Sequence, residues 1–115
     1  MPKFLFLILD DDLSEKKAAA GGSGIAEMSR YAGELAQAGK MKDGAPLGPG
    51  KRAKTLRRDR KGKVQVIDGP YTESKEIVSG YFLIEARDRR EAVALARRCP
   101  HLAIGSIEVR EVLEV

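Results

Sequence analysis

Apolar residues recur along the 115-residue chain in patterns that predict two helices and several strands. Residues 3–9 form a short apolar run that is closed by three aspartates, which predicts a first strand. Within residues 25–39 apolar positions follow a 3.6-residue period, which predicts a first helix that Gly39 ends. A second helix is predicted between Asp88 and Pro100, because Asp88 with Glu91 is a typical helix start and a proline prevents continuation.

The segment between the two predicted helices is rich in turn signals. Residues 40–50 hold three glycines and two prolines, which forbid a regular helix and predict an irregular or edge strand. Residues 53–58 and 63–67 flank the turn Asp59-Arg60-Lys61-Gly62, so together they predict a β-hairpin.

Residues 78–86 and 107–113 predict further strands before and after the second helix. The resulting order is strand, helix, two or three strands, helix, strand. This order predicts an α+β fold of ferredoxin-like type, with an antiparallel sheet and both helices on one face. The length fits a single domain that spans residues 1–115.

The first predicted strand is apolar on both faces. Phe4, Phe6 and Ile8 point one way, and the leucines at positions 5, 7 and 9 point the other way. Two helices cover only one face, and half-exposed antiparallel strands normally alternate apolar with polar residues. We therefore expect a second copy of the sheet to cover the other face, which makes the protein a homodimer.

Composition is typical of a soluble globular domain, with 33% charged residues and a mean hydropathy of −0.32. The apolar run of residues 4–9 is too short for a signal-peptide core and is followed by acidic residues. The single cysteine, Cys99, excludes an internal disulfide and suits a reducing compartment. We expect a cytoplasmic protein that does not associate with membranes.

The net charge of +4 raises the question of nucleic-acid binding. Eight lysines and arginines lie within residues 51–63 and face only Asp59 there. The cluster contains no aromatic residue to stack on a base, and no recognition-helix or zinc-knuckle pattern accompanies it. Since clustered charge gives affinity without specificity, we predict a basic hairpin and no specific nucleic-acid partner.

Residues 68–76 (Asp-Gly-Pro-Tyr-Thr-Glu-Ser-Lys-Glu) combine a forced turn with three carboxylates and a lysine. Asp68 follows the apolar stretch 64–67, where we expect a partly desolvated carboxylate with a movable pKa, so Asp68 is the candidate catalytic residue. The alternative is a turn-initiating role, in which Asp68 accepts backbone donors around Gly69.

Four residues near Asp68 are candidate ligand-binding residues. Glu73 and Lys75 suit a polar ligand, with Lys75 neutralising an anionic group, although a charged loop is otherwise a solvated surface or an internal ion pair. Tyr71 and Tyr81 offer hydroxyl groups to a pocket wall. Since neighbouring strand residues alternate, either Tyr81 or Phe82 faces the helices and the other faces the opposite side.

The remaining candidate groups favour structural roles. Cys99 and His101 flank Pro100, so a nucleophile–base pair needs the loop to bring them together; a buried thiol and a loop histidine are the simpler interpretation. Residues 10–12 with Glu15 match no calcium-loop spacing, so an acidic loop that ends the strand is favoured over a cation site. The sequence contains no Walker, dinucleotide, zinc or Gly-x-Ser-x-Gly pattern, and we predict no metal and no cofactor.

The Asp-Gly-Pro-Tyr motif at 68–71, the Glu-Ser-Lys-Glu loop at 73–76 and Gly80-Tyr81 resemble the hallmark of the YCII-related, or DGPF-domain, family. The resemblance covers nearly the whole chain and includes Cys99-Pro100. It implies a dimeric α+β barrel in which two sheets meet face to face. Some members look like small lyases or dehalogenating enzymes that use a histidine–aspartate pair, with the histidine on the first helix. This chain has no histidine in residues 25–39.

Three functional hypotheses follow. The first is a domain that binds a small polar or anionic molecule of unknown identity, with or without enzymatic activity. The second is a lyase or isomerase that uses Asp68 as general base. The third is a regulatory partner of a sigma-factor-type transcription system, because other members of the family are encoded with, or joined to, alternative sigma factors.

Overall fold

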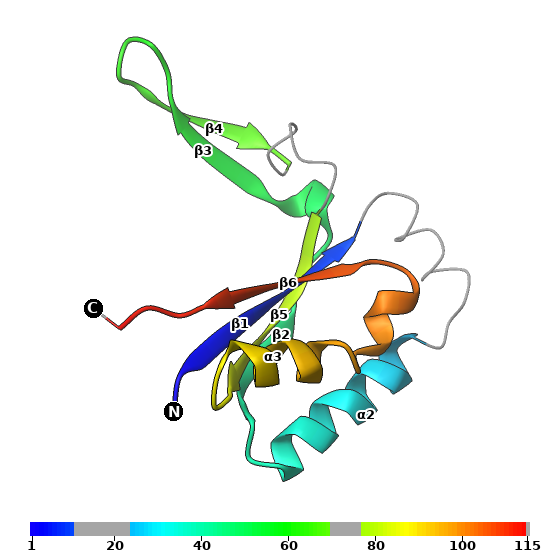
Figure 1. Ribbon diagram of the computed structural model, residues 1–115. Helices are drawn as coiled ribbons and strands as arrows, with labels where there is room; N and C mark the ends of the chain where they lie inside the picture. Colours follow the sequence, from blue (N-terminus) through cyan, green and yellow to red (C-terminus); the bar gives the residue numbers. More distant parts are fainter. Residues whose placement is uncertain (11–23, 70–76, 115) are drawn as a thin grey trace.

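The computed structural model describes residues 1–10, 24–69 and 77–114 (Figure 1). The strands are β1 (Lys3–Asp10), β2 (Met41–Pro46), β3 (Lys54–Arg58), β4 (Val64–Asp68), β5 (Ile77–Glu85) and β6 (Ser106–Glu111). The helical elements are α2 (Gly24–Gln37), α3 (Arg89–Ala96) and two short 3-10 turns, η1 (Gly50–Arg52) and η2 (Pro100–Ala103). No helix of the described chain is both long and apolar enough to cross a membrane.

Four strands form one antiparallel sheet in the order β2-β5-β1-β6. In this sheet the first strand of the chain lies between the third and the fourth, which is the ferredoxin-like arrangement. The predicted α+β fold is therefore confirmed. The predicted edge strand is β2, and the predicted hairpin is the separate two-stranded sheet of β3 and β4.

The helix boundaries agree with the sequence signals. Gly39, with φ of +74°, follows the end of α2, and its lack of a side chain permits this left-handed conformation. Asp88 caps α3, because its side chain accepts a hydrogen bond from the backbone N–H of Glu91 at 2.8 Å. The Glu91 carboxylate reaches back and accepts from the backbone N–H of Arg87 at 3.0 Å.

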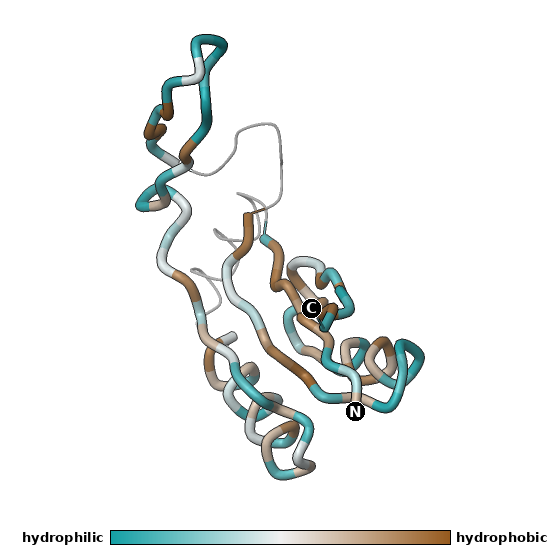
Figure 2. Tube along the Cα trace, turned by 90° about the vertical axis from the view of Figure 1, so that its left-hand side faces the viewer, coloured by the Kyte–Doolittle hydropathy of each residue, from teal (hydrophilic) through white to brown (hydrophobic). Residues whose placement is uncertain are grey.

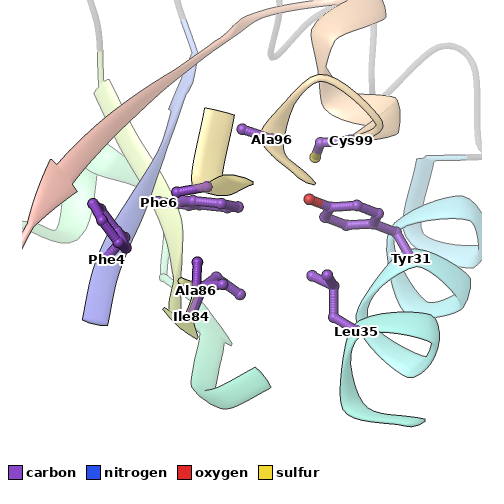
Figure 3. Close-up of a cluster of buried hydrophobic side chains, with 9 residues drawn as sticks. Phe4, Phe6, Tyr31, Leu35, Ile84, Ala86, Ala96 and Cys99 are labelled. Atoms are coloured by element: carbon purple, nitrogen blue, oxygen red, sulfur yellow. The ribbon is translucent and has the colours of Figure 1, made fainter. Parts of the chain in front are cut away.

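The core lies between the sheet and the two helices (Figure 3). Phe4, Phe6 and Ile84 of β1 and β5 are almost fully buried, and they pack with side chains of α2 and α3. The Tyr31 hydroxyl of α2 donates a hydrogen bond to the carbonyl of Leu95 in α3 at 2.7 Å, which ties the two helices together.

The other face of the sheet, which we term the open face, carries half-buried apolar residues. The register pairs Leu5 with Leu83 and Leu7 with Tyr81, and Leu9 continues the row on β1. Phe82 therefore faces the helices, where its ring lies 5.9 Å from that of Tyr31, and Tyr81 faces away from them. This answers which of the two aromatic residues belongs to the core.

The β3–β4 hairpin, which we term the arm, extends away from the four-stranded sheet (Figure 1). Figure 2 shows that its tip is hydrophilic and that its hydrophobic positions lie nearer its base. All five residues of β4 are exposed, although three of them are valine or isoleucine. An apolar sequence is therefore not sufficient to bury a strand in this chain.

Candidate functional site

A cavity of about 570 Å³ lies between the first half of α2, the sheet and η2. Most of its lining is apolar and includes Ile8, Met28, Ala32, Phe82 and Ile104. The lining residues that carry or can gain a charge near neutral pH are Asp10, Glu27 and His101. The described lining contains no lysine or arginine.

Asp10 is the last residue of β1, and its side chain lies on the helix-covered side of the sheet. Buried and half-buried residues alternate along β1, so Asp10 shares its face with Phe4, Phe6 and Ile8. Only 9% of Asp10 is exposed. In the described chain its Oδ1 atom is buried without a hydrogen-bond partner. An unsatisfied buried carboxylate oxygen is costly, and such groups are concentrated at functional sites.

His101 of η2 lies directly beside Asp10 and is equally buried. Its Nε2 atom is 2.9 Å from the Leu9 carbonyl oxygen and 3.0 Å from Asp10 Oδ1. When Nε2 carries the hydrogen of a neutral imidazole, it donates to the Leu9 carbonyl. The Asp10 oxygen is then within ion-pair distance but off the line of that hydrogen bond. Asp10 therefore keeps the capacity to accept a hydrogen bond or a proton.

Gly105 allows His101 to approach β1. A Cβ atom at this position would lie 2.4 Å from both His101 Nε2 and the Leu9 carbonyl oxygen, which is far inside van der Waals contact. The Gly105 N–H also donates to the His101 carbonyl at 2.9 Å. Only glycine therefore fits between the histidine ring and the end of β1.

Comparison with known families assigns the chain. The model of the YCII-related domain matches residues 3–115, nearly the full length. The chain belongs to the YCII-related family. It is also 36% identical over 86 residues to an uncharacterized protein of Rhizobium meliloti (strain 1021), which corresponds to 73% of this chain and 68% of that protein. The relative is uncharacterized and specifies no reaction or ligand.

The candidate residue Asp68 lies elsewhere in this YCII-related domain, at the end of β4 on the arm. Its side chain is 84% exposed and forms an ion pair with Lys54. The expectation of a partly desolvated carboxylate is therefore wrong for this chain. The reason is that no other element of the described ranges covers the end of β4. Asp68 does not line the cavity, and its catalytic role stays a prediction.

The four predicted ligand-binding residues have different positions relative to the cavity. Tyr71, Glu73 and Lys75 lie in residues 70–76, outside the described part of the chain. Tyr81 borders the cavity, although its side chain lies on the open face of the sheet, where its hydroxyl donates a hydrogen bond to Asp43 Oδ2 at 3.2 Å. That hydrogen bond to a carboxylate raises the pKa of Tyr81 above its ordinary value.

Cys99 is a buried thiol, as the simpler interpretation of the sequence has it. It is 3% exposed, and its Sγ donates to Met28 Sδ at 3.6 Å. Desolvation by burial raises the pKa of the thiol, which lowers the thiolate fraction at neutral pH. No group of metal-ligating side chains that could hold an ion occurs among the described residues.

The Asp10–His101 pair is the arrangement that the sequence analysis missed, since it considered each residue with a different neighbour. The signal was available in the predicted topology. In a ferredoxin-like sheet the last strand pairs antiparallel with the first, and here Leu9 pairs with Ser106. The residues just before the last strand must then lie beside the end of the first strand, where Asp10 is located.

Proposed function

We propose that this YCII-related domain binds a small, largely apolar molecule in the cavity and transfers a proton to or from it through Asp10 and His101. The observation that carries the proposal is the Asp10 Oδ1 atom. It is buried at the cavity, lacks a hydrogen-bond partner in the described chain and lies 3.0 Å from His101 Nε2. A ligand that donates a hydrogen bond would satisfy it.

The composition of the cavity supports a particular class of ligand. A volume of about 570 Å³ suits a small metabolite, and an apolar lining with a few polar groups is typical of such sites. The described lining contributes the carboxylates of Asp10 and Glu27 and no permanent cation. This charge pattern favours a neutral or cationic molecule with a donor group over the anionic ligand that Lys75 suggested.

Proton transfer is the chemistry that this pair is suited to perform. Asp10 would accept a proton from the ligand, and His101 would hold the carboxylate in position and stabilise the charges as they change. The burial of both side chains strengthens the two interactions. In an isomerase, the proton returns to another atom of the same molecule. In a lyase, the loss of the proton accompanies the departure of a leaving group.

Asp68 provides the competing assignment for the general base. One ligand-binding assay can decide between Asp10 and Asp68, because replacing either aspartate by asparagine removes the charge with little change in side-chain size. We therefore treat Asp68→Asn as the matched control for Asp10→Asn. The control also retains the arm's Lys54 and alters only the charge at an exposed position.

The experiment is a thermal-shift screen of fragments grouped as anionic, neutral and cationic, followed by calorimetry on the hits. We expect hits in the neutral and cationic groups, and a loss of affinity of at least about tenfold, or 1.4 kcal/mol, in Asp10→Asn. His101→Gln should weaken binding in the same direction. Asp68→Asn should bind within about twofold of the wild type.

Two results would contradict the proposal. Affinity that is lost in Asp68→Asn but kept in Asp10→Asn would transfer the role of general base to Asp68. Hits confined to anionic fragments would show that the charge of the cavity does not select the ligand. Circular dichroism of each variant separates a loss of binding from a loss of folding.

A further inference from the structure

The outward side of α3 forms an open depression that is rimmed by arginines. Its volume is about 580 Å³, and it is lined by Arg89, Arg90, Val93, Ala94 and Arg97. All of these residues are exposed, whereas Ala92 and Ala96 of the same helix are buried in the core. We term this region the arginine surface. The described lining of the cavity at Asp10 and His101 includes none of its residues, so the two regions are separate.

Helix geometry brings two of the arginines onto one stripe. Arg90 and Arg97 are seven residues apart, which is close to two full turns, so their side chains leave the same side of α3 about 10.5 Å apart along its axis. Arg97 has helical dihedral angles, and its backbone N–H donates to the Val93 carbonyl at 3.0 Å, so the helical geometry continues to this residue. Val93 and Ala94 lie between the two arginines and form an apolar centre.

The arginines of residues 87–98 differ in what neutralises them. Three of them form ion pairs, at 3.2, 3.9 and 3.6 Å respectively, in Arg87–Glu91, Arg89–Glu111 and Arg98–Glu34. Within the described residues, Arg90 and Arg97 have no ion-pair partner. The segment contains five arginines and two acidic residues, which gives a net charge of +3. The charge that no carboxylate neutralises is therefore concentrated on the stripe of Arg90 and Arg97.

The position of Arg90 is unfavourable for the stability of the helix. Arg90 lies in the first turn of α3, where the positive end of the helix dipole disfavours a cation. Arg97 follows the last turn, where the same dipole favours a cation, so helix stability alone accounts for Arg97 but not for Arg90. An anionic group bound beside Arg90 would offset the unfavourable interaction.

The combination of groups indicates an acidic protein segment as the occupant. Arginine binds carboxylate groups through two parallel hydrogen bonds. An apolar centre between charged ends is typical of a protein–protein interface, in which arginine is enriched. Single-stranded nucleic acid is bound with the help of aromatic side chains, and the described lining contains none. Inorganic phosphate would use the arginines and leave the apolar centre uncovered.

We propose that the arginine surface binds an amphipathic acidic helix of a partner protein. The helix places an apolar side chain on Val93 and Ala94, and one carboxylate beside each of Arg90 and Arg97. Acidic residues that are seven positions apart in a helix have the same spacing as these two arginines, so a helix that lies along α3 matches both charges. The small side chain of Ala94 leaves room for the apolar side chain of the partner.

The test uses a synthetic helical peptide as the probe and NMR on the isotope-labelled full chain. The probe is an alanine-based peptide with two glutamates seven positions apart and two leucines between them. The control peptide has glutamine in place of both glutamates. We expect the glutamate peptide to shift the amide signals of residues 89–97, and the glutamine peptide to bind at least about tenfold more weakly, which corresponds to about 1.4 kcal/mol.

Neighbouring substitutions separate recognition by the arginine surface from general charge attraction. Arg97→Gln removes a guanidinium group from the stripe, and Arg98→Gln removes the same charge from the next residue, which already pairs with Glu34. We expect Arg90→Gln and Arg97→Gln each to weaken binding of the glutamate peptide at least about fivefold, and Arg98→Gln to weaken it less than about twofold. Because these side chains are exposed, circular dichroism should show an unchanged fold.

Four results would overturn the proposal. The first is the absence of amide shifts in residues 89–97 with the glutamate peptide, and the second is equal binding of the two peptides. The third is an equal loss in Arg97→Gln and Arg98→Gln, which would mean that only the net charge matters. The fourth is tighter binding of inorganic phosphate or single-stranded DNA at the same amides. None of these measurements depends on Asp10 or His101, so the outcome is independent of the proposed function.

Discussion

The ends of strands β1 and β4 have similar sequences and opposite environments. Each is an apolar strand that closes with an aspartate. Asp10 at the end of β1 is 9% exposed and lies beside His101, whereas the side chain of Asp68 at the end of β4 is 84% exposed and lies beside Lys54. The apolar character of a strand therefore does not determine how deeply its last carboxylate is buried.

The difference arises from the elements that pack over each strand. β1 is a central strand of the four-stranded sheet, and η2 covers the end that carries Asp10. Among the strands that the structure describes, β4 pairs with β3 alone, and the Asp68 side chain at its end is exposed and paired with Lys54. How far a carboxylate is shielded from water depends on the segment that packs over it. For Asp10 that segment is the loop that carries His101.

The largest expected effect comes from a comparison of two glycine-to-alanine substitutions. Gly105 lies beside the end of β1, and Gly69 follows the end of β4. Gly105→Ala should cost about 3 kcal/mol of unfolding free energy, because the new Cβ meets a backbone oxygen and displaces His101 from a buried site. Gly69→Ala should cost only about 1 kcal/mol, because the glycine has a φ of +91° but a new Cβ would meet no atom of the described residues within 4 Å. Urea denaturation measures both, and equal losses would show that η2 does not hold the end of β1.

A smaller effect is expected at Glu91. Its carboxylate accepts hydrogen bonds, whereas Asp10 Oδ1 has no hydrogen-bond partner among the described residues. The Arg87 backbone N–H and the Lys40 ammonium, both at 3.0 Å, hold the pKa of Glu91 below its ordinary value of 4.5. Because the folded-state pKa is the lower one, the charged form stabilises the protein above pH 4.5, and this stability is lost as the pH falls through the folded-state pKa.

Comparison of the wild type with Glu91→Gln over a range of pH tests this expectation. The variant should be the less stable protein near neutrality, and the difference should close as the solution is acidified below pH 4.5. A difference that stays constant with pH would mean that the charge of Glu91 does not contribute and that only its hydrogen-bond geometry matters.

The smallest effect is expected at the exposed end of β4. Asp68→Ala and Lys54→Ala should each change the unfolding free energy by less than about 0.5 kcal/mol, since a solvent-exposed ion pair contributes little. A loss above about 1 kcal/mol would show that Asp68 has structural partners beyond Lys54.

Much of the fold could be predicted because its signals are local. The apolar run of β1, the cap at Asp88 and the glycine after α2 each determine structure within a few residues, and all three predictions are confirmed. The hairpin was predicted from its turn for the same reason. The number of strands between the helices was predicted wrongly: two or three were expected and the structure has four, β2 to β5, because residues 40–50, which contain both strand and turn signals, do form β2.

The candidate site could not be read in the same way, since it depends on contacts between distant parts of the chain. The dense motif at residues 68–76 favoured Asp68, but no element in the described part of the chain buries that residue. Asp10 and His101 have no local motif. They meet because β6 pairs with β1 in one register and because Gly105 leaves room for the ring.

The contact between Cys99 and Met28 makes the Cys99 thiol a reporter of local opening of the structure. Met28 lines the cavity from α2, and the thiol it touches precedes η2 on the opposite wall. A thiol reagent can react only when these walls separate, so the labelling rate under native conditions counts the opening events. A molecule that bridges the walls would lower the labelling rate of Cys99. Binding could therefore be followed without knowledge of the reaction that the molecule undergoes.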